Sequence, residues 1–176
     1  FNTLTIFLAL GSMPLAFTYP LMKRYTYWPQ LFLGITFNYG LILGWTSINT
    51  EIMIAPIIFY LGAIFWTLGY DTIYGFQDIK DDEIIGLKST SIKFKSNPHI
   101  FLYICYSILI VTLFITGYLM ELNKFYFIFL ILIIYQLFFL QLNKLDIKSP
   151  SSCLKTFKSN NFLGLIVFFS ILIGKF

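Results

Sequence analysis

The sequence predicts an all-α fold, a multi-pass bundle of about six membrane-spanning helices. Hydrophobic residues make up 58% of the 176 residues and charged residues only 11%, and the mean hydropathy is +0.80, well above the apolar share of a soluble domain. Long apolar runs recur along the whole chain, each near the ~20 residues that a helix rising ~1.5 Å per residue needs to cross a bilayer. These runs do not alternate between polar and apolar residues, which argues against a β-barrel.

The six predicted spans follow one another along the chain. They cover residues 4–19, 30–48, 52–69, 100–120, 125–142 and a last run through 161–173. The purely apolar part of the last run is short, so it must extend back through Asn160 and Asn161 to cross a bilayer. A re-entrant hairpin is the alternative for this last run.

The remaining single residues carry little chemistry. Cys105 lies in an apolar run and Cys153 in a predicted loop, without the spacing of a zinc site or a disulfide framework, so both are expected to be unpaired thiols. His99 follows Pro98 at a predicted helix start and is expected at the surface. Phe1 opens directly into apolar sequence, and we therefore expect residues 1–176 to be one domain that is truncated at its N-terminus.

The basic residues predict the topology. Ten of the twelve lie in the connections after the first, third and fifth runs: Lys23, Arg24, Lys80, Lys88, Lys93, Lys95, Lys144, Lys148, Lys155 and Lys158. The positive-inside rule places these three connections in the cytoplasm, or in the matrix of a mitochondrion, and both termini on the opposite side. This distribution accounts for the net charge of +4 without a nucleic-acid partner.

Acidic residues gather just after the third predicted span. Five of the eight fall within thirteen positions: Asp71, Asp78, Asp81, Asp82 and Glu83. If the third helix continued past residue 69, then Asp71, Asp78 and Asp82 would fall within an arc of about 40°. Like charges at these spacings repel one another, and a divalent cation removes that conflict. Oxygen ligands of this kind suit Mg²⁺ together with substrate phosphate, so the cluster predicts a phosphate- or diphosphate-bearing substrate.

The opposite charge is predicted on the same side of the membrane. Lys23, Arg24 and Lys88 are able to donate charge-assisted hydrogen bonds to phosphate oxygens. The positive-inside rule, however, predicts basic residues there whatever the protein does, and an acidic loop is also a common solvated connection. The interleaving of Tyr74 and Gly86 with the acidic residues favours a functional segment.

Three segments carry a resemblance to a known family. Residues 71–91 read DTIYGFQDIKDDEIIGLKSTS, which resembles the second aspartate-rich motif of the UbiA-type intramembrane aromatic prenyltransferases, and within them the 4-hydroxybenzoate polyprenyltransferases of ubiquinone synthesis. Residues 19–30, YPLMKRYTYWPQ, and 153–164, CLKTFKSNNFLG, agree with that family too. The resemblance extends over essentially the whole chain, which is similar to helices four to nine of a nine-helix bundle.

The resemblance implies a reaction and roles for particular residues. Asp78 and Asp82 would be the Mg²⁺ ligands and Asp71 a further carboxylate of the same catalytic cap, with Lys23, Arg24 and Lys88 near the diphosphate. The implied reaction transfers a polyprenyl group from polyprenyl diphosphate to 4-hydroxybenzoate and releases diphosphate, in a bacterial or mitochondrial inner membrane. The family's first motif, of the Asn-Asp-x-x-Asp kind, has no counterpart in these 176 residues, so a separate N-terminal half is an expected partner.

Other readings remain open at this point. A relative in the same superfamily would accept another ring, such as haem or a menaquinone precursor, and a truncated remnant would be inactive. A membrane transporter would use the acidic cluster as an ion-binding mouth, but the predicted spans lack the charged residues that mark a transport path. The 21 Phe and 12 Tyr residues fit either a shielded prenyl channel or lipid-facing filler.

Overall fold

The structure is a computed structural model that describes residues 2–176, and all of its regular secondary structure there is helical. Six helical segments are long and apolar enough to cross a membrane, which confirms the predicted fold class. Four are the single helices α3 (Pro29–Ile48), α4 (Ile54–Gly75), α7 (Pro98–Leu119) and α9 (Pro150–Lys175). The first combines α1 (Thr3–Thr18), η1 (Tyr19–Leu21) and α2 (Met22–Tyr25), and the fifth combines α8 (Lys124–Ile134), η2 (Tyr135–Gln141) and η3 (Leu142–Lys144).

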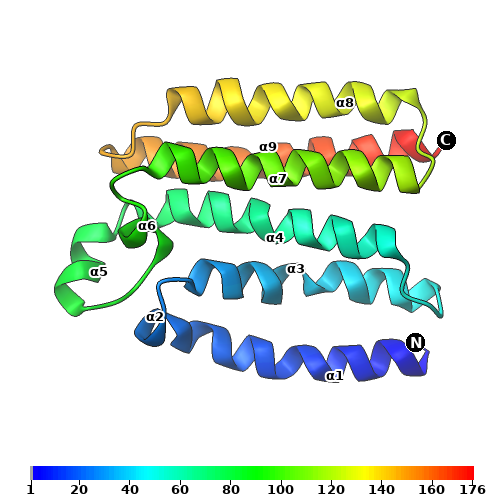
Figure 1. The fold of residues 1–176 in the computed structure, drawn as a ribbon, viewed down its shortest axis with the longest axis horizontal. Coiled ribbons are helices and arrows are strands. Elements are labelled where there is room, and N and C mark those ends of the chain that lie inside the picture. Colours follow the sequence, from blue (N-terminus) through cyan, green and yellow to red (C-terminus); the bar gives the residue numbers. More distant parts are fainter. Residues whose placement is uncertain (1) are drawn as a thin grey trace.

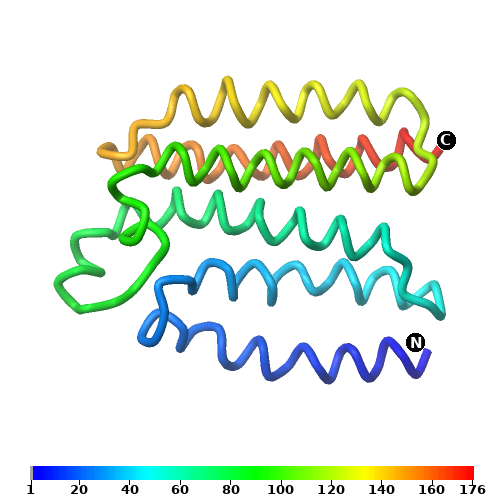
Figure 2. Tube along the Cα trace, viewed as in Figure 1, coloured from blue at the N-terminus to red at the C-terminus, as the bar shows by residue number. Residues whose placement is uncertain are grey.

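The long helices run side by side and alternate in direction (Figure 1). Both ends of the chain lie at one end of the bundle, and the short helices α5 (Ile79–Ile85) and α6 (Thr90–Lys93) project beyond the other end. The tube in Figure 2 shows that the connections after the first, third and fifth spans share this second end. The basic connections therefore gather at one end of the molecule, as the charge pattern predicts.

The third span is longer than predicted and then breaks. Helix α4 continues to Gly75, so it contains Asp71; the prediction that the spans lack charged residues is wrong at this position. The Phe76 and Gln77 amides donate to the carbonyls of Ile73 and Tyr74, which tightens and closes the last turn. The predicted single stripe of Asp71, Asp78 and Asp82 is therefore wrong, because Asp71 lies on α4 while Asp82 lies on the separate helix α5.

The last span is one continuous helix. Ser149 caps α9 by accepting a hydrogen bond from the Ser152 amide, and Pro150 occupies the first turn, where its missing N–H costs nothing. The re-entrant hairpin is therefore wrong. Cys153 lies in this helix and is fully buried, so its prediction as a loop residue is wrong, although both cysteines are unpaired as expected.

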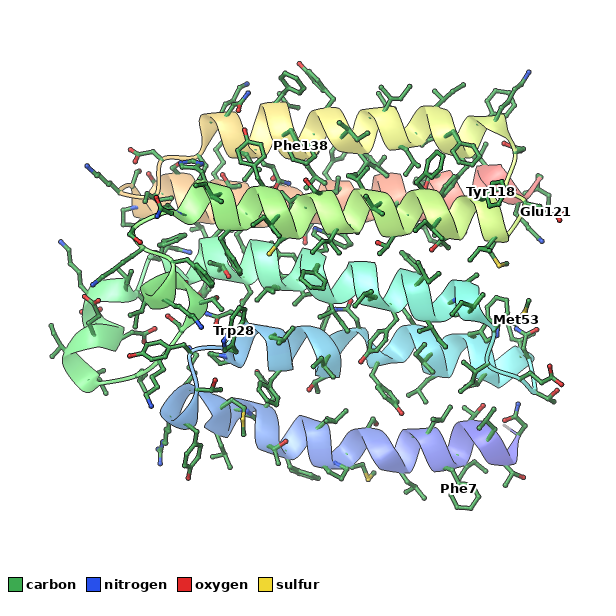
Figure 3. The ribbon with its side chains drawn as sticks, viewed as in Figure 1. Phe7, Trp28, Met53, Tyr118, Glu121 and Phe138 are labelled. Atoms are coloured by element: carbon green, nitrogen blue, oxygen red, sulfur yellow. The ribbon has the colours of Figure 1, made fainter. Side chains whose placement is uncertain are left out.

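The core lies where α4 packs against α7 and where α8 packs against α9. A Cβ atom added at Gly69 of α4 would lie 2.5 Å from the ring of Tyr106 on α7, which is fully buried. Helix α1, by contrast, is mostly exposed, and Figure 3 shows its Phe7 directed away from the bundle. The tightly packed half of the bundle holds the elements that lead into the acidic segment.

Candidate active site

The acidic segment forms a short helix of its own. Asp78 precedes α5, its carbonyl accepts the Asp82 amide at 2.9 Å, and α5 ends where Gly86 adopts the left-handed conformation with φ 79°. A residue with a side chain adopts that conformation only at a cost. Asp78 and Asp82 are thus separated by one helical turn, which is the spacing at which two side chains share a face.

Lys88 joins the acidic segment to the connection between the first two spans. Its amide donates to the Lys23 carbonyl at 2.8 Å, and its ammonium group donates to the Tyr25 carbonyl at 3.3 Å and lies 5.7 Å from the Tyr27 ring centre. Residues 19–30 and 71–91, which are far apart in the sequence, therefore meet at one end of the bundle.

A small cavity of about 200 Å³ brings Lys23 and Asp71 together. Its other lining residues come from η1 and from the start of α3: Tyr19, Pro20, Pro29, Gln30 and Leu33. Lys23 and Asp71, which carry opposite charges, thus line the same cavity. Arg24 is exposed and does not line this cavity, so the predicted basic pair is split between two environments.

A buried network of polar groups, which the sequence did not predict, fixes this end of the bundle. The Gln30 side-chain oxygen accepts the Thr90 amide at 3.0 Å, and the Thr90 and Thr72 hydroxyls lie 2.6 Å apart. The Ser91 hydroxyl donates to the Thr72 carbonyl. A Cβ atom added at Gly75 would lie 2.3 Å from the oxygen of that hydroxyl. Satisfied buried networks position their elements firmly, so helices α3, α4 and α6 are held in a fixed arrangement.

A larger cavity of about 620 Å³ lies between α3, α4 and α9. It is lined by Trp66, Tyr70, Phe157 and the amides Asn38, Asn160 and Asn161, among others. The Trp66 indole donates to Asn160 at 2.8 Å, and the Tyr70 ring packs edge-on against Trp66 and Phe157. Only the segment 153–164 pointed to this cavity in advance; Trp66, Tyr70 and Asn38 gave no signal, because aromatic and amide residues are common in such helices.

The donor set fits a magnesium ion shared with a substrate and does not form a complete metal site. Among residues 2–176 no three His, Cys, Asp or Glu side chains converge on one point. Mg²⁺ is commonly held by one or two carboxylates and by the oxygens of a substrate phosphate, and Asp78 and Asp82 offer such a pair. Glu83 is engaged with Lys95 in an ion pair, which leaves these two carboxylates available.

These features define a class of protein: a membrane-embedded helical bundle whose interfacial end carries carboxylate and ammonium groups beside an aromatic cavity. The model of the UbiA prenyltransferase family matches residues 1–171. The chain belongs to this family.

Curated relatives agree with that assignment. The chain is 39% identical to 4-hydroxybenzoate geranyltransferase 2 of Lithospermum erythrorhizon, with 99% of the chain and 57% of the relative aligned. It is 42% identical to the mitochondrial 4-hydroxybenzoate polyprenyltransferase of Homo sapiens, over 98% of the chain and 47% of the relative. For the corresponding Dictyostelium discoideum enzyme the identity is 38%, over 99% of the chain and 38% of the relative. No solved structure matches the chain.

The chain spans about half the length of the curated relatives it matches. The aligned part contains the acidic segment, the Lys88 junction and both cavities described above.

Proposed function

We propose that this chain supplies the second aspartate-rich motif of a Mg²⁺-dependent prenyltransferase that transfers a polyprenyl group from its diphosphate to 4-hydroxybenzoate, in ubiquinone biosynthesis. Residues 1–176 would form one prenyltransferase-like domain that acts together with a further N-terminal half. The names of the relatives support the acceptor and the prenyl donor.

The observation that carries this proposal is the junction at Lys88. The hydrogen bond from its amide to the Lys23 carbonyl joins the acidic segment to the basic segment at one end of the bundle. A diphosphate needs both kinds of group: cations bind it directly, and carboxylates hold its metal ion. The alternatives of an ion-conducting mouth or a solvated loop do not require that junction.

The acidic residues have distinct proposed roles. Asp78 and Asp82 hold Mg²⁺, and Asp71 is a further carboxylate that Lys23 faces across the small cavity. When bound, Mg²⁺ neutralises the negative charge that develops on the departing diphosphate. Lys23, Arg24 and Lys88 add fixed positive charge near that leaving group, which is most effective where water is excluded.

The larger cavity suits the organic part of the reaction. The bond between the allylic carbon and the diphosphate oxygen breaks, a ring carbon of 4-hydroxybenzoate forms the new bond, and the ring loses a proton to regain its aromaticity. The faces of Trp66, Tyr70 and Phe157 are able to stabilise an allylic cation and to keep water away from it. The Asn161 amide and the side-chain oxygen of Asn38, whose NH2 group already donates within the protein, offer hydrogen bonds to the 4-hydroxybenzoate substrate.

The location follows from the topology. We propose an inner membrane, bacterial or mitochondrial, with the acidic segment on the cytoplasmic or matrix side, because the basic connections share that end of the bundle. The names of two relatives describe them as mitochondrial, which supports a mitochondrial inner membrane as one of the two locations.

The test is Mg²⁺-dependent prenylation of radiolabelled 4-hydroxybenzoate by membranes that contain the chain, alone or with the N-terminal helices of a relative. We expect activity only with the added helices, and a loss of about a hundredfold or more in Asp78→Ala. Asp81→Ala, which removes an equal charge from an exposed site of the same helix, is the matched control and should retain activity. An inserted chain that is inactive in every combination would point to a remnant, and prenylation of another ring would overturn the proposed acceptor.

A further inference from the structure

A third cavity, of about 590 Å³, lies between the end of the fifth span and the start of α9. Two ammonium groups, from Lys144 and Lys155, line it together with polar side chains and one apolar residue: Gln136, Leu140, Ser151, Ser152, Thr156 and Ser159. No carboxylate is among the described residues that line it. The cavity therefore offers positive charge and hydrogen-bond donors, the groups that bind phosphate.

Two buried side chains in this cavity lack a partner. Gln136 and Thr156 are each only 8% exposed, and no hydrogen bond joins the Gln136 amide or the Thr156 hydroxyl to another group of residues 2–176. Within residues 2–176, the Thr116 hydroxyl is the one side-chain polar group that is both fully enclosed and without a partner. The polar atoms of Gln136 and Thr156 are therefore not fully enclosed. The Gln136 amide and the Thr156 hydroxyl are therefore available to bind a ligand in the cavity.

The backbone contributes further to an anion site. Ser151 and Ser152 lie in the first turn of α9, where the helix dipole favours negative charge; the Ser152 amide donates to the Ser149 hydroxyl. The Ser152 hydroxyl accepts the Asp146 amide at 3.1 Å, which leaves its own proton free to donate. The π-helical segment η2 carries Gln136, and such irregular turns are frequent at functional sites.

This cavity is separate from the proposed active site. At about 100° per residue, its α9 residues 151, 152, 155, 156 and 159 occupy the helix face opposite to residues 157, 160, 161, 164 and 165, which line the aromatic cavity. It therefore faces away from the aromatic cavity.

We propose that this cavity binds a phosphate group carried by an anionic phospholipid. It lies at the basic end of two membrane-length helices, and basic cavities between such helices on that side of a membrane suit acidic headgroups. Tyr135 and Phe139, next in sequence to the lining residues Gln136 and Leu140, are 53% and 55% exposed and stack on each other. They offer an apolar track for an acyl chain, which a soluble phosphate would not use.

The test is native mass spectrometry of the purified chain in detergent with added phosphatidylglycerol, with phosphatidylcholine as the uncharged reference. In Lys144→Gln/Lys155→Gln we expect the affinity for phosphatidylglycerol to fall about 25-fold, at roughly fivefold per lysine. Lys148→Gln/Lys158→Gln, which removes equal charge from exposed positions at the same end, should bind within about twofold of the parent. Equal weakening in both pairs would overturn the proposal in favour of a general basic surface.

A third variant tests the buried amide. Gln136→Leu keeps all the charges and should lower the affinity about fivefold, with unchanged helix content by circular dichroism; unchanged affinity would contradict a role for this group. Inorganic phosphate at millimolar concentration should not displace the lipid. Its displacement of the lipid would show that a soluble anion is the ligand.

Discussion

The positions of a few polar side chains decide what the interfacial end of this molecule is able to bind. The sequence predicted Lys88 as a phosphate-binding cation from its place beside the acidic segment. In the structure, its amide also donates to the Lys23 carbonyl, and that hydrogen bond depends on tertiary folding. Side-chain types could thus be predicted from the sequence, whereas the contact that joins the two segments could not.

Gln30 is the residue whose removal should loosen this end most clearly. Gln30→Leu leaves the Thr90 amide, now held at 3.0 Å by the Gln30 side chain, buried and unpaired, so we expect a loss of about 1–3 kcal/mol in the free energy of unfolding. Reversible unfolding of the purified chain in mixed micelles measures this loss.

Gln77→Leu is the control, because the Gln77 amide donates to the Tyr74 carbonyl at 3.1 Å in an exposed setting. That variant should change the free energy of unfolding by less than about 0.5 kcal/mol. Equal effects of the two substitutions would contradict the role assigned to the buried network.

At the scale of the helices, the sequence predicted the number and order of the spans but not their irregular ends. The break after Gly75 has no proline to mark it. It accompanies the burial of Phe76 and the hydrogen bonds between residues three apart that close the turn. The π-helical segment η2 likewise lies inside a run that is mostly apolar and has no glycine or proline to mark the irregularity. Tertiary packing decides both features, and the hydropathy of the sequence therefore could not predict them.

Close approach of α4 and α7 makes Gly69 a sensitive position. The methyl group of Gly69→Ala would lie 2.5 Å from the buried Tyr106 ring. We therefore expect a loss of about 1–3 kcal/mol in the free energy of unfolding. Gly40→Ala, at a helical position with nothing within 4 Å of an added Cβ, is the matched control. A stable Gly69→Ala protein would mean that the two helices pack less closely than described.

At the scale of the whole molecule, the charge pattern predicted which connections share an end, and the arrangement in Figure 1 agrees. The side of the membrane that this end faces stays a prediction from the positive-inside rule. The aromatic cavity between α3, α4 and α9 could not be predicted, because it depends on how helices that are distant in the sequence pack.

Cysteine labelling tests the orientation. Cys105 and Cys153 are both fully buried, so the parent chain should react slowly with a membrane-impermeant maleimide. Ser96→Cys lies in the connection after the third span and should be labelled from the cytoplasmic or matrix side. Thr50→Cys lies in the connection after the second span, at the opposite end of the bundle, and should be labelled from the other side. The reverse pattern would contradict the predicted topology.

The most direct measurement for the central claim is the binding of prenyl diphosphate to the chain in the presence of a relative's N-terminal helices, with Mg²⁺ or with EDTA. We predict binding that requires Mg²⁺ and weakens at least about tenfold in Asp82→Asn, while Asp81→Asn binds like the parent. Binding that is equally strong in EDTA, or that is unchanged in Asp82→Asn, would contradict the claim that this acidic segment forms part of a magnesium-diphosphate site.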